Sequence, residues 1–535
     1  MVAVAVPTSD LSTIVEVLDR AAVMNAEVEA YVEPATETSV RRSMTFAEWH
    51  TRATAAAAWL SELGVGANDV VCIVMAPSID FAVASQAVAR VGGIVSGVNP
   101  RMGATERGTI FDRMQPIVTL VEDDHVADLG PSAGLVATRS SLVDASWSAS
   151  QYEPSPRAST DPVAVVWTSG TTGAPKGALF DHESLKAVAA GTDVLSQPGD
   201  RRLSPLPFSH VSYVTRAWDE IAHAVTTVIS PSPWKAPSAL KAMVAERITV
   251  AQGVPTQWAL LLGLEEFENA DLSSLRVAGT GAARMAAADV ARLRTRLKVP
   301  VVVRYTSTET SLGTGTRPGD SDEIVATTVG RPVTGVEILL VDPEGGAVAP
   351  GEVGRVQLRS AASMKGYVAS RDGLERGLPP VIDIELTTQA LGDDGWVTTG
   401  DFGVLDHSGN LTLVGRDNEM YQRGGYNVYP AEVEKCLEQL TSVAAVAVVA
   451  GNDPILGEVG VAFVVASSIG DPPRLDDLRR TVGAELADYK APDVMVVLAE
   501  LPVTSMGKID KRGLLQAANE AAAERSEGLR APGSD

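Results

Sequence analysis

The feature that most constrains this sequence is an alternation of short apolar runs with segments of helical periodicity, which continues to about residue 330. The run Val70–Met75 is continuous and apolar, as expected for a strand buried on both faces of a mainly parallel sheet. Before it, Thr45 and Glu48 form a capping-box pattern ahead of an alanine-rich segment, and Gly64 is a typical helix stop. This alternation predicts an α/β fold with helices on both faces of a parallel sheet.

The pattern changes after Gly330. Short β-type runs at Val336–Val341, Gly354–Leu358 and Leu411–Val414 are separated by turns rich in Gly, Pro and Asp, which predicts a β-rich subdomain. Beyond residue 416 the pattern becomes that of a smaller unit of mixed helices and strands, with a helix that begins near Pro430. A chain of 535 residues is too long for one simple core, so we expect two or more domains.

The net charge and the cysteines exclude several classes of protein. The chain has 44 basic and 67 acidic residues, which give a formal net charge of −23 at pH 7. A surface this acidic repels nucleic acid and anionic lipid, so we expect neither as a partner. The apolar stretches are too short or too interrupted for a membrane span, and no secretory signal pattern is present. Cys72 and Cys436 match no zinc or disulfide pattern. We therefore expect a cytoplasmic protein in which both thiols are buried.

A loop rich in glycine and hydroxyl groups follows the predicted strand Val163–Trp167. Glycine lets backbone N–H groups approach a phosphate closely, hydroxyl groups donate further hydrogen bonds, and a lysine neutralises charge. The pattern is not the Walker motif, because no Ser or Thr follows the lysine. A solvated loop without a ligand is the alternative. The candidate residues for binding a polyphosphate are Thr168, Ser169, Gly170, Thr171, Thr172, Gly173 and Lys176.

Four later residues each have a side chain suited to part of a nucleotide. Tyr305 offers an aromatic face to a base, and Glu309 is a hard oxygen ligand for Mg²⁺. Asp401, at a turn, is suited to accept hydrogen bonds from two ribose hydroxyls. Lys508 stands on a glycine-containing loop near the end of the chain. Taken singly, each residue can also have a purely structural role. For Lys508 alone, an exposed surface lysine without function is the stronger interpretation.

In this order and at these separations, the segments resemble the superfamily of acyl-CoA synthetases, peptide-synthetase adenylation domains and luciferases, from about residue 10 to 515. The resemblance implies a large N-terminal domain, residues 1–415, of layered α/β subdomains plus the β-rich subdomain. It also implies a small mobile α+β domain, residues 421–535, after a hinge at 416–420. The family commonly has Asp or Lys at the hinge position that is Asn418 here. ATP, Mg²⁺ and coenzyme A are the implied ligands, and homodimers are frequent in the family.

The resemblance assigns a role to each nucleotide-binding candidate. The 168–177 loop would hold the β- and γ-phosphates of ATP. Further contacts are implied with adenine from Tyr305, Gly281, Ala282 and Ala283, with phosphates and Mg²⁺ from Thr308 and Glu309, and with ribose from Asp401 and Arg416.

The resemblance also implies the residues for chemistry and for coenzyme A. Lys508 matches the lysine that bridges the acid and the α-phosphate during adenylation. This role is physically reasonable, because a carboxylate that attacks a phosphate brings two anions together, and catalysis is then mostly charge neutralisation and positioning. In coenzyme A ligases the segment that matches residues 423–434 forms part of the pantetheine tunnel. This indicates Gly424, Gly425 and Tyr426 as tunnel residues and favours coenzyme A as acceptor.

The acid-binding segment differs from that of ligases for plain fatty acids, which are usually more apolar here. The resemblance places His210 where it gates the acyl pocket or contacts the carboxylate, and so makes it a catalytic candidate. Polar and aromatic side chains nearby suggest a short pocket for a ring-bearing acid with a polar substituent; alternatively, some of them face solvent or pair with each other. The pocket candidates are His210, Arg216, Trp218, Trp258, Thr280 and Thr306.

Together these patterns predict an ATP-dependent ligase that adenylates a carboxylic acid, releases pyrophosphate and transfers the acyl group to coenzyme A. Three alternatives stay open. The acceptor is a carrier-protein thiol, or the enzyme activates nitrite to diazotise an aromatic amine, or the chain is a binding protein without catalysis. The presence of Lys508, Glu309 and Asp401 argues against the last.

Overall fold

The computed structural model describes residues 3–168, 175–281, 285, 287–417, 419–423, 426–468, 472–504 and 508–530. The chain forms two compact units, one of Met1–Ile338 with Gln357–Thr399 and the other of Leu339–Val356 with Gly400–Asp535. This division passes through a sheet built from segments on both sides of residue 400, and the hinge at residues 416–420 stays a prediction.

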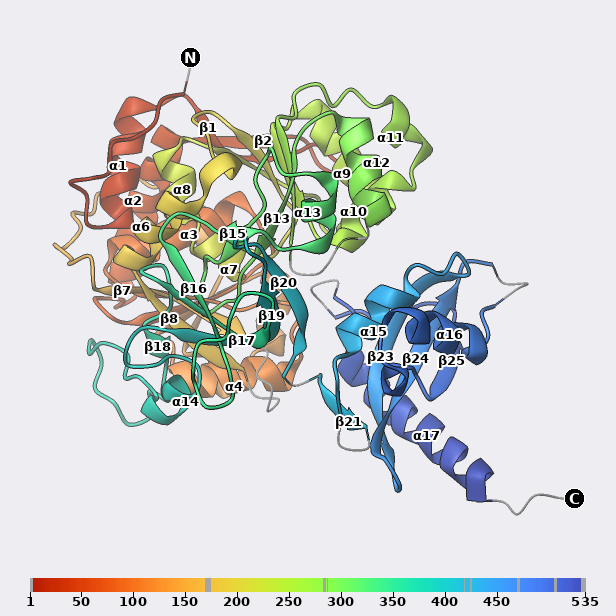
Figure 1. Ribbon diagram of the computed structural model, residues 1–535. Coiled ribbons are helices and arrows are strands. Elements are labelled where there is room, and N and C mark those ends of the chain that lie inside the picture. Colours follow the sequence, from red (N-terminus) through yellow and green to blue (C-terminus); the bar gives the residue numbers. More distant parts are fainter. Residues whose placement is uncertain are drawn as a thin grey trace, which may run out of the picture. The chain divides into compact units, whose positions relative to one another are not determined.

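The first unit is of the α/β class, with two large sheets and helices packed on them (Figure 1). Its helices are α1 (Ile14–Met24), α2 (Phe46–Glu62), α3 (Ile79–Arg90), α4 (Ala104–Met114), α5 (Arg139–Ser146), α6 (His182–Gly191), α7 (Val211–Val214), α8 (Ala217–Ala222), α9 (Ala236–Ala245), α10 (Pro255–Leu262), α11 (Glu265–Asn269), α12 (Ala287–Leu297), α13 (Asp322–Thr327) and α14 (Ile384–Thr388).

The first sheet has the strand order β18-β8-β7-β4-β3-β5-β6. Its strands are β3 (Val70–Val74), β4 (Ile94–Gly97), β5 (Val118–Val121), β6 (Leu135–Thr138), β7 (Pro162–Thr168), β8 (Lys176–Asp181) and β18 (Gly366–Tyr367). The strands from β7 to β6 are parallel, whereas β8 and β18 add antiparallel pairs at one edge.

Both faces of this sheet are buried, as the sequence predicted. On β3, Val71 and Ile73 pack into a cluster with α2 and α3, whereas Cys72 on the opposite face packs into a cluster with α4. The capping box of α2 is present, with Thr45 accepting a hydrogen bond from the Glu48 N–H. The prediction of a parallel sheet covered by helices on both faces is therefore confirmed.

The second sheet has the strand order β15-β14-β13-β12-β11-β9-β10-β1-β2. Its strands are β1 (Glu29–Glu33), β2 (Arg42–Thr45), β9 (Arg201–Ser204), β10 (Thr226–Ile229), β11 (Val250–Gly253), β12 (Val277–Gly281), β13 (Val301–Tyr305), β14 (Thr314–Gly315) and β15 (Arg331–Pro332). The strands from β1 to β13 are parallel, and helices α9, α10 and α12 pack on one face through a shared apolar cluster.

A third sheet has the order β16-β17-β19-β20 and confirms the predicted β-rich region. Its strands are β16 (Val336–Val341), β17 (Val353–Ser360), β19 (Val397–Leu405) and β20 (Leu411–Arg416).

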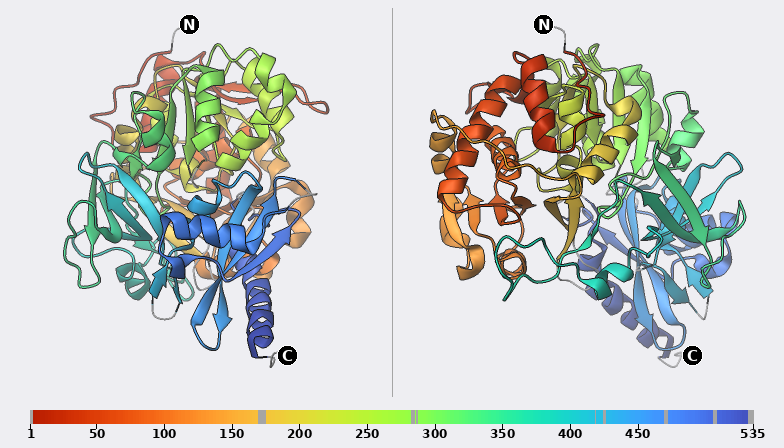
Figure 2. Two further views of the ribbon diagram at one scale, coloured as in Figure 1. Left: turned by 45° about the vertical axis from the view of Figure 1, so that its right-hand side comes forward. Right: turned by 90° about the vertical axis from the view of Figure 1, so that its left-hand side faces the viewer.

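The C-terminal part of the second unit is a small α+β fold, also as predicted. Its elements are β21 (Tyr421–Arg423), β22 (Tyr426–Val428), α15 (Pro430–Leu437), β23 (Val443–Asp453), β24 (Gly457–Ala466), α16 (Leu475–Glu485), β25 (Val494–Leu498) and α17 (Lys511–Arg530). Helices α15 and α16 pack on one face of the sheet, and α17 packs on the other through Leu514, Ala518 and Ala522 (Figure 2).

Two further predictions concern the cysteines and the membrane. Cys72 and Cys436 are both free thiols and both buried, as expected. Over the described ranges, no helix combines the length and the apolar character that crossing a membrane requires.

Candidate active site

The glycine-rich loop is presented by a β-hairpin in the first unit. Strands β7 and β8 are antiparallel, and their register pairs Thr168 with Lys176 at the base of the loop. Ser169, Gly170, Thr171, Thr172 and Gly173 lie outside the described residues. The hairpin therefore brings the first and last candidates of the loop together on neighbouring strands.

Glycine is required beside Lys176 by close packing. A Cβ atom at Gly177 would lie 2.8 Å from a methyl carbon of Val165 and 2.9 Å from one of Val368. Such contacts are shorter than van der Waals separation, so a larger side chain would displace β8 and the lysine that precedes it.

A chain of three side chains links the loop to the predicted metal ligand. The Lys176 ammonium lies 5.5 Å from the centre of the Tyr367 ring, within the range of a cation–π contact. The Tyr367 hydroxyl donates a hydrogen bond of 2.7 Å to Glu309 Oε1. Burial raises the pKa of Tyr367 above its ordinary value, and the Glu309 carboxylate adds to this shift. The phenol therefore stays protonated and orients the carboxylate.

Glu309 is also held through its backbone, because its carbonyl accepts a hydrogen bond of 2.8 Å from the Met364 N–H. One carboxylate oxygen is engaged by Tyr367, which leaves Oε2 as the oxygen suited to a hard cation. Within the described part of the chain, no group of three or more His, Cys, Asp or Glu side chains could hold a metal ion. The single Glu309 carboxylate would suit a Mg²⁺ ion only if most of its ligands came from elsewhere.

The candidate base-binding residues lie at the carboxyl ends of two parallel strands, where ligands of open α/β sheets commonly bind. Tyr305 ends β13 and is buried, and Gly281 ends the neighbouring strand β12. A Cβ atom at Gly281 would lie 2.7 Å from the Arg304 carbonyl oxygen, so the close approach of the strands requires glycine. Ala282 and Ala283 lie outside the described residues.

The segment after Tyr305 is a compact turn rich in hydroxyl groups. Thr310 is buried, and its Oγ1 accepts a hydrogen bond of 3.1 Å from the Ser307 N–H. Thr308 is half-buried, whereas Thr306 is exposed and hydrogen-bonds locally to the Ser307 carbonyl. The turn thus fixes the backbone between Tyr305 and Glu309, and Thr306 contacts its own turn.

Asp401 and Arg416 form an ion pair in the second unit. They are register partners on β19 and β20, and Arg416 Nε lies 2.7 Å from Asp401 Oδ1. The Asp401 residue is 3% exposed, whereas the Arg416 side chain is 53% exposed. A buried carboxylate oriented by an exposed arginine is suited to accept hydrogen bonds from vicinal hydroxyls.

Lys508 lies in the same unit on a short loop closed by a bridge between Val503 and Ile509. The pKa of its ammonium is lowered first by desolvation and then by the charge of Arg416, while Asp401 acts in the opposite direction. The side chain is exposed, and both members of the Asp401–Arg416 pair act electrostatically on its charge.

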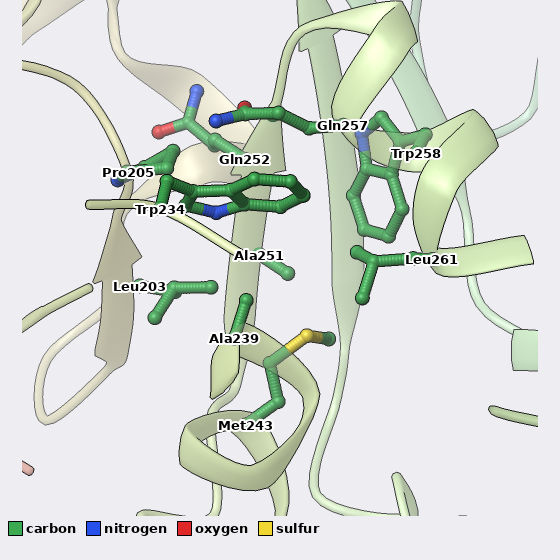
Figure 3. Close-up of a pocket in the computed structure, with 11 residues that line it drawn as sticks. Leu203, Pro205, Trp234, Ala239, Met243, Ala251, Gln252, Gln257, Trp258 and Leu261 are labelled. Atoms are coloured by element: carbon green, nitrogen blue, oxygen red, sulfur yellow. The ribbon is translucent and has the colours of Figure 1, made fainter. Parts of the chain in front are cut away.

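A small, open pocket lies between the second sheet and helices α9 and α10. Figure 3 shows the Trp234 ring and two glutamine amides at one end, and aliphatic side chains at the other. Trp258 lines it, and its indole N–H donates to the Gly279 carbonyl at 3.0 Å. The pocket is lined by Leu203, Pro205, Trp234, Ala239, Met243, Ala251, Gln252, Gly253, Gln257, Trp258 and Leu261.

The other predicted pocket residues lie elsewhere. Trp218 is fully buried in the main core and does not line this pocket. Thr280 is buried on β12, and its hydroxyl has no hydrogen-bond partner among the described residues. His210 caps α7, where its Nδ1 accepts a hydrogen bond of 3.3 Å from the Ser212 N–H.

Arg216 reaches the pocket indirectly. It hydrogen-bonds Asp219 at 3.2 Å and the pocket residue Gln252 at 3.0 Å. Burial and the nearby Arg202 lower the pKa of Arg216 to about 10, so the guanidinium remains charged near neutral pH. Arg216 thus belongs to a buried charge network beside the pocket rather than to the pocket wall.

Among the coenzyme A candidates, the structure describes Tyr426 alone, because Gly424 and Gly425 lie outside the described residues. The hinge candidate Asn418 also lies outside them. Tyr426 is exposed, and its ring stacks on Tyr489 with the ring centres 4.6 Å apart. This aromatic pair lies beside the β21–β22 hairpin.

Several site residues were not found from the sequence. Tyr367 precedes a long polar connection, and only the pairing of β18 with β8 brings it to Lys176 and Glu309. Trp234 and Gln252 also line the pocket from separate segments. The available signals were an aromatic residue within a segment rich in Pro and Ser, for Trp234, and a polar residue at the end of an apolar strand, for Gln252.

The chain is similar both to family models and to individual known proteins. Residues 18–368 match the model of a family described as AMP-binding enzyme, and residues 432–508 match that of the AMP-binding enzyme C-terminal domain. A Mycobacterium tuberculosis ligase that couples a methyl-dioxo-octahydroindenyl propanoyl group to CoA is 34% identical over 487 residues. The match covers 85% of this chain and 90% of that protein.

Two other similar proteins differ in the acids for which they are named. The indoleacetate–CoA ligase of Aromatoleum aromaticum is 31% identical over 449 residues, which are 80% of this chain and 84% of that protein. The structure of a fatty acyl CoA synthetase of Mycobacterium tuberculosis matches with a TM-score of 0.75 and 27% identity, over 96% of this chain and 99% of that chain.

Proposed function

The chain belongs to the AMP-binding enzymes, and from this premise we propose that it is an AMP-forming ligase that joins a carboxylic acid to coenzyme A. The observation that carries the proposal is the contact chain from Lys176 through Tyr367 to Glu309 beside the glycine-rich hairpin. A cation and an oriented carboxylate in this arrangement suit the phosphates of ATP and an accompanying Mg²⁺.

In the first step, a carboxylate oxygen of the acid attacks the α-phosphorus of ATP, the bond to the β-phosphate bridge breaks, and pyrophosphate leaves. Lys176 neutralises charge on the leaving phosphates, and Glu309 would hold the Mg²⁺ ion that accompanies them. Asp401 accepts hydrogen bonds from the ribose hydroxyls, and Lys508 bridges the acid and the α-phosphate. Positioning and charge neutralisation of this kind supply most of the catalysis in phosphoryl transfer.

In the second step, the thiolate of coenzyme A attacks the acyl carbon of the adenylate, and AMP leaves as the C–O bond breaks. Tyr426 and Tyr489 present a stacked aromatic pair on an exposed part of the second unit. We propose that this pair borders the path of the pantetheine arm. The acceptor is coenzyme A rather than a carrier protein, because the two ligases of highest identity reported above are both named for CoA.

The acid is ring-containing. Trp234 and Trp258 line the small pocket with flat aromatic surface, which suits a ring better than a flexible chain (Figure 3). Two of the similar ligases are named for acids with fused rings, whereas the structural relative is named for fatty acyl groups. A panel of acids therefore separates these classes.

The test is pyrophosphate release with ATP, Mg²⁺ and a panel of aryl, alicyclic and straight-chain acids, each with and without coenzyme A. We expect sustained release with ring-containing acids only when coenzyme A is present, together with an acyl-CoA product. A preference for long straight chains would contradict the ring assignment. Release with nitrite and an arylamine, and with no acid, would replace the ligase function by diazotisation.

A further inference from the structure

The loop that carries Lys508 leads directly into helix α17, whose first residue is Lys511. The Thr504 N–H donates a hydrogen bond of 2.7 Å to the Lys508 carbonyl across this loop. The Asp510 N–H donates another, of 2.8 Å, to the Pro502 carbonyl. Helix α17 is itself held on the sheet by apolar packing. Lys511 therefore stands between a fixed helix and a loop closed by backbone hydrogen bonds.

The Lys511 ammonium bridges two carboxylates. It lies 2.6 Å from Glu419 Oε2 and 2.9 Å from Glu434 Oε1, and the lysine side chain is 20% exposed. Burial lowers the pKa of Lys511, but the Glu434 and Glu419 carboxylates outweigh burial and raise the pKa above its ordinary value. The ammonium therefore stays charged near neutral pH. Without it, two carboxylates would be left close together in a partly buried site, where like charges repel.

The two carboxylates are anchored in different places. Glu434 lies on α15, and its Oε1 also accepts a hydrogen bond of 2.7 Å from the Val448 N–H in β23. Glu434 is therefore part of the body of the C-terminal fold. Glu419 lies just beyond the end of β20, and its N–H donates to the Arg416 carbonyl at 3.1 Å. Through the shared ammonium, the segment after Arg416 is tied to the fold that carries the lysine loop.

This connection joins two groups that adenylation must bring to one nucleotide. Arg416 pairs with Asp401 at 2.7 Å, and both residues act electrostatically on the charge of Lys508. Glu419 follows Arg416 by three positions, and Lys511 follows Lys508 by three positions. The path from the Asp401–Arg416 pair to the lysine loop is therefore short, with an ion pair at its centre. Such a connection limits the positions that the loop can take relative to the ribose carboxylate.

We propose that Lys511 is a positioning residue for adenylation, which holds the Lys508 loop, through Glu419, where Lys508 can bridge the acid and the α-phosphate. The inference rests on the proposed function, since that function gives Lys508 its role. Lys511 contacts neither the acid nor the nucleotide in this arrangement and acts through Lys508. Because catalysis of adenylation is mostly the placement of charge, a displaced Lys508 loses rate even though it keeps its charge.

The first test measures pyrophosphate–ATP exchange, which reports adenylation. In Lys511→Met we expect kcat to fall about tenfold to a hundredfold, the loss that a small displacement of a catalytic group causes. The KM for ATP should stay nearly constant, because Asp401 is untouched. Lys511→Arg keeps the charge and should restore part of the rate. The matched control is Lys490→Met, which removes the Lys490–Glu432 ion pair, also 2.6 Å long and similarly exposed, and should leave kcat unchanged.

A double-variant cycle separates positioning from general damage. If Lys511 acts through Lys508, adding Lys511→Met to Lys508→Ala should cause no further loss of adenylation. Two losses that multiply would assign Lys511 a structural role and overturn the inference. Thioester formation from a synthetic acyl adenylate should continue in Lys511→Met, and urea unfolding checks its stability. Glu419→Gln keeps the Lys511–Glu434 pair and should lower kcat in the same direction, so the test stands even if Lys511→Met does not fold.

Amide hydrogen exchange keeps the test independent of turnover. In the nucleotide-free protein, Glu419→Gln should speed exchange of the Thr504 and Asp510 amides, which close the lysine loop, by about fivefold, whereas Lys490→Met should not. This result supports the link even if no acid is adenylated, which would contradict the proposed function alone. Unchanged exchange of both amides in Glu419→Gln and in Lys511→Met, or an undiminished kcat for adenylation in both variants, overturns the inference.

Discussion

Tyr367 contacts both charged side chains of the proposed phosphate site, the Lys176 ammonium and the Glu309 carboxylate. Its ring contacts the Lys176 ammonium, and its hydroxyl donates to Glu309 at 2.7 Å. Because the residue is 3% exposed and burial raises its pKa, the hydroxyl proton stays in place to orient the carboxylate. Replacing a group that orients a metal ligand typically lowers metal affinity or activity by about tenfold to a hundredfold.

Tyr367→Phe removes this hydrogen bond and keeps the ring beneath Lys176. We expect kcat/KM for Mg²⁺·ATP to fall about tenfold, since the Glu309 carboxylate loses its orienting donor. Steady-state pyrophosphate release at varied Mg²⁺·ATP measures the change. Tyr152→Phe, at a partly buried residue of the same unit, is the matched control. An unchanged kcat/KM in Tyr367→Phe would show that Glu309 does not depend on Tyr367.

Glu309 is a single carboxylate, and no cluster of three or more metal-binding side chains occurs in the described residues. We therefore expect Mg²⁺ to bind with the nucleotide and not before it. Calorimetry should detect no stoichiometric Mg²⁺ binding to the nucleotide-free protein, and chelation by EDTA should abolish pyrophosphate release. Stoichiometric Mg²⁺ binding without ATP would contradict this expectation.

At the scale of elements, the start of helix α6 is joined to the start of helix α1. His182, the first residue of α6, accepts a hydrogen bond of 3.2 Å on Nδ1 from the N–H of Ile14, the first residue of α1. The imidazole can accept only when Nδ1 carries no proton. Burial lowers the pKa of His182 from 6.5 to about 4, so the folded state keeps the neutral ring.

This junction predicts a pH dependence of stability. As pH falls below 6.5 the unfolded chain takes up a proton at His182, whereas the folded chain does not until about pH 4. The stability due to the neutral ring is therefore lost as pH falls through this window. Between pH 7 and pH 5 we expect the wild-type protein to lose about 2 kcal/mol more free energy of unfolding than His182→Gln. Urea unfolding at both pH values tests this, and equal losses would contradict it.

The elements themselves were largely predictable from the sequence, and the site was predictable in part. Continuous apolar runs such as β3 are local signals, and β7 precedes the glycine-rich loop as expected. Contacts such as Tyr367 with Glu309 were not predictable, because they join residues 58 positions apart and depend on the pairing of β18 with β8.

Trp218 and Trp258, both expected near the acid, show the same limit. Trp258 lines the small pocket beside α10, whereas Trp218 is fully buried in another core cluster. Both are tryptophans on short helices, so the sequence around each gives the same local signal. The face that each helix presents is set by packing against distant segments, which a single sequence does not specify.

At the scale of the whole molecule, the functional residues are divided between two units. The hairpin, Tyr367 and Glu309 belong to the first unit, whereas Asp401 and Lys508 belong to the second. In the proposed mechanism adenylation uses residues of both units, whereas thioester formation has no step that needs a lysine between the acid and the α-phosphate. The two half-reactions should therefore depend differently on Lys508.

Lys508→Ala should reduce adenylation on the order of a hundredfold to a thousandfold, the loss typical of one oxyanion contact, while thioester formation from a synthetic acyl adenylate continues. Pyrophosphate–ATP exchange reports the first half-reaction, and acyl-CoA production from the adenylate reports the second. Lys435→Ala, at an exposed lysine of the same unit, is the control. Equal loss in both half-reactions would assign Lys508 a structural role.

The central claim is that the acid carboxylate attacks the α-phosphorus of ATP, and isotope transfer tests this most directly. A ring-containing acid with both carboxylate oxygens labelled with ¹⁸O is incubated with the enzyme, ATP, Mg²⁺ and coenzyme A, and the nucleotide products are analysed by mass spectrometry. The account predicts AMP that carries one ¹⁸O atom, unlabelled pyrophosphate and no ADP. Formation of ADP with the label in inorganic phosphate, or of AMP without label, would contradict it.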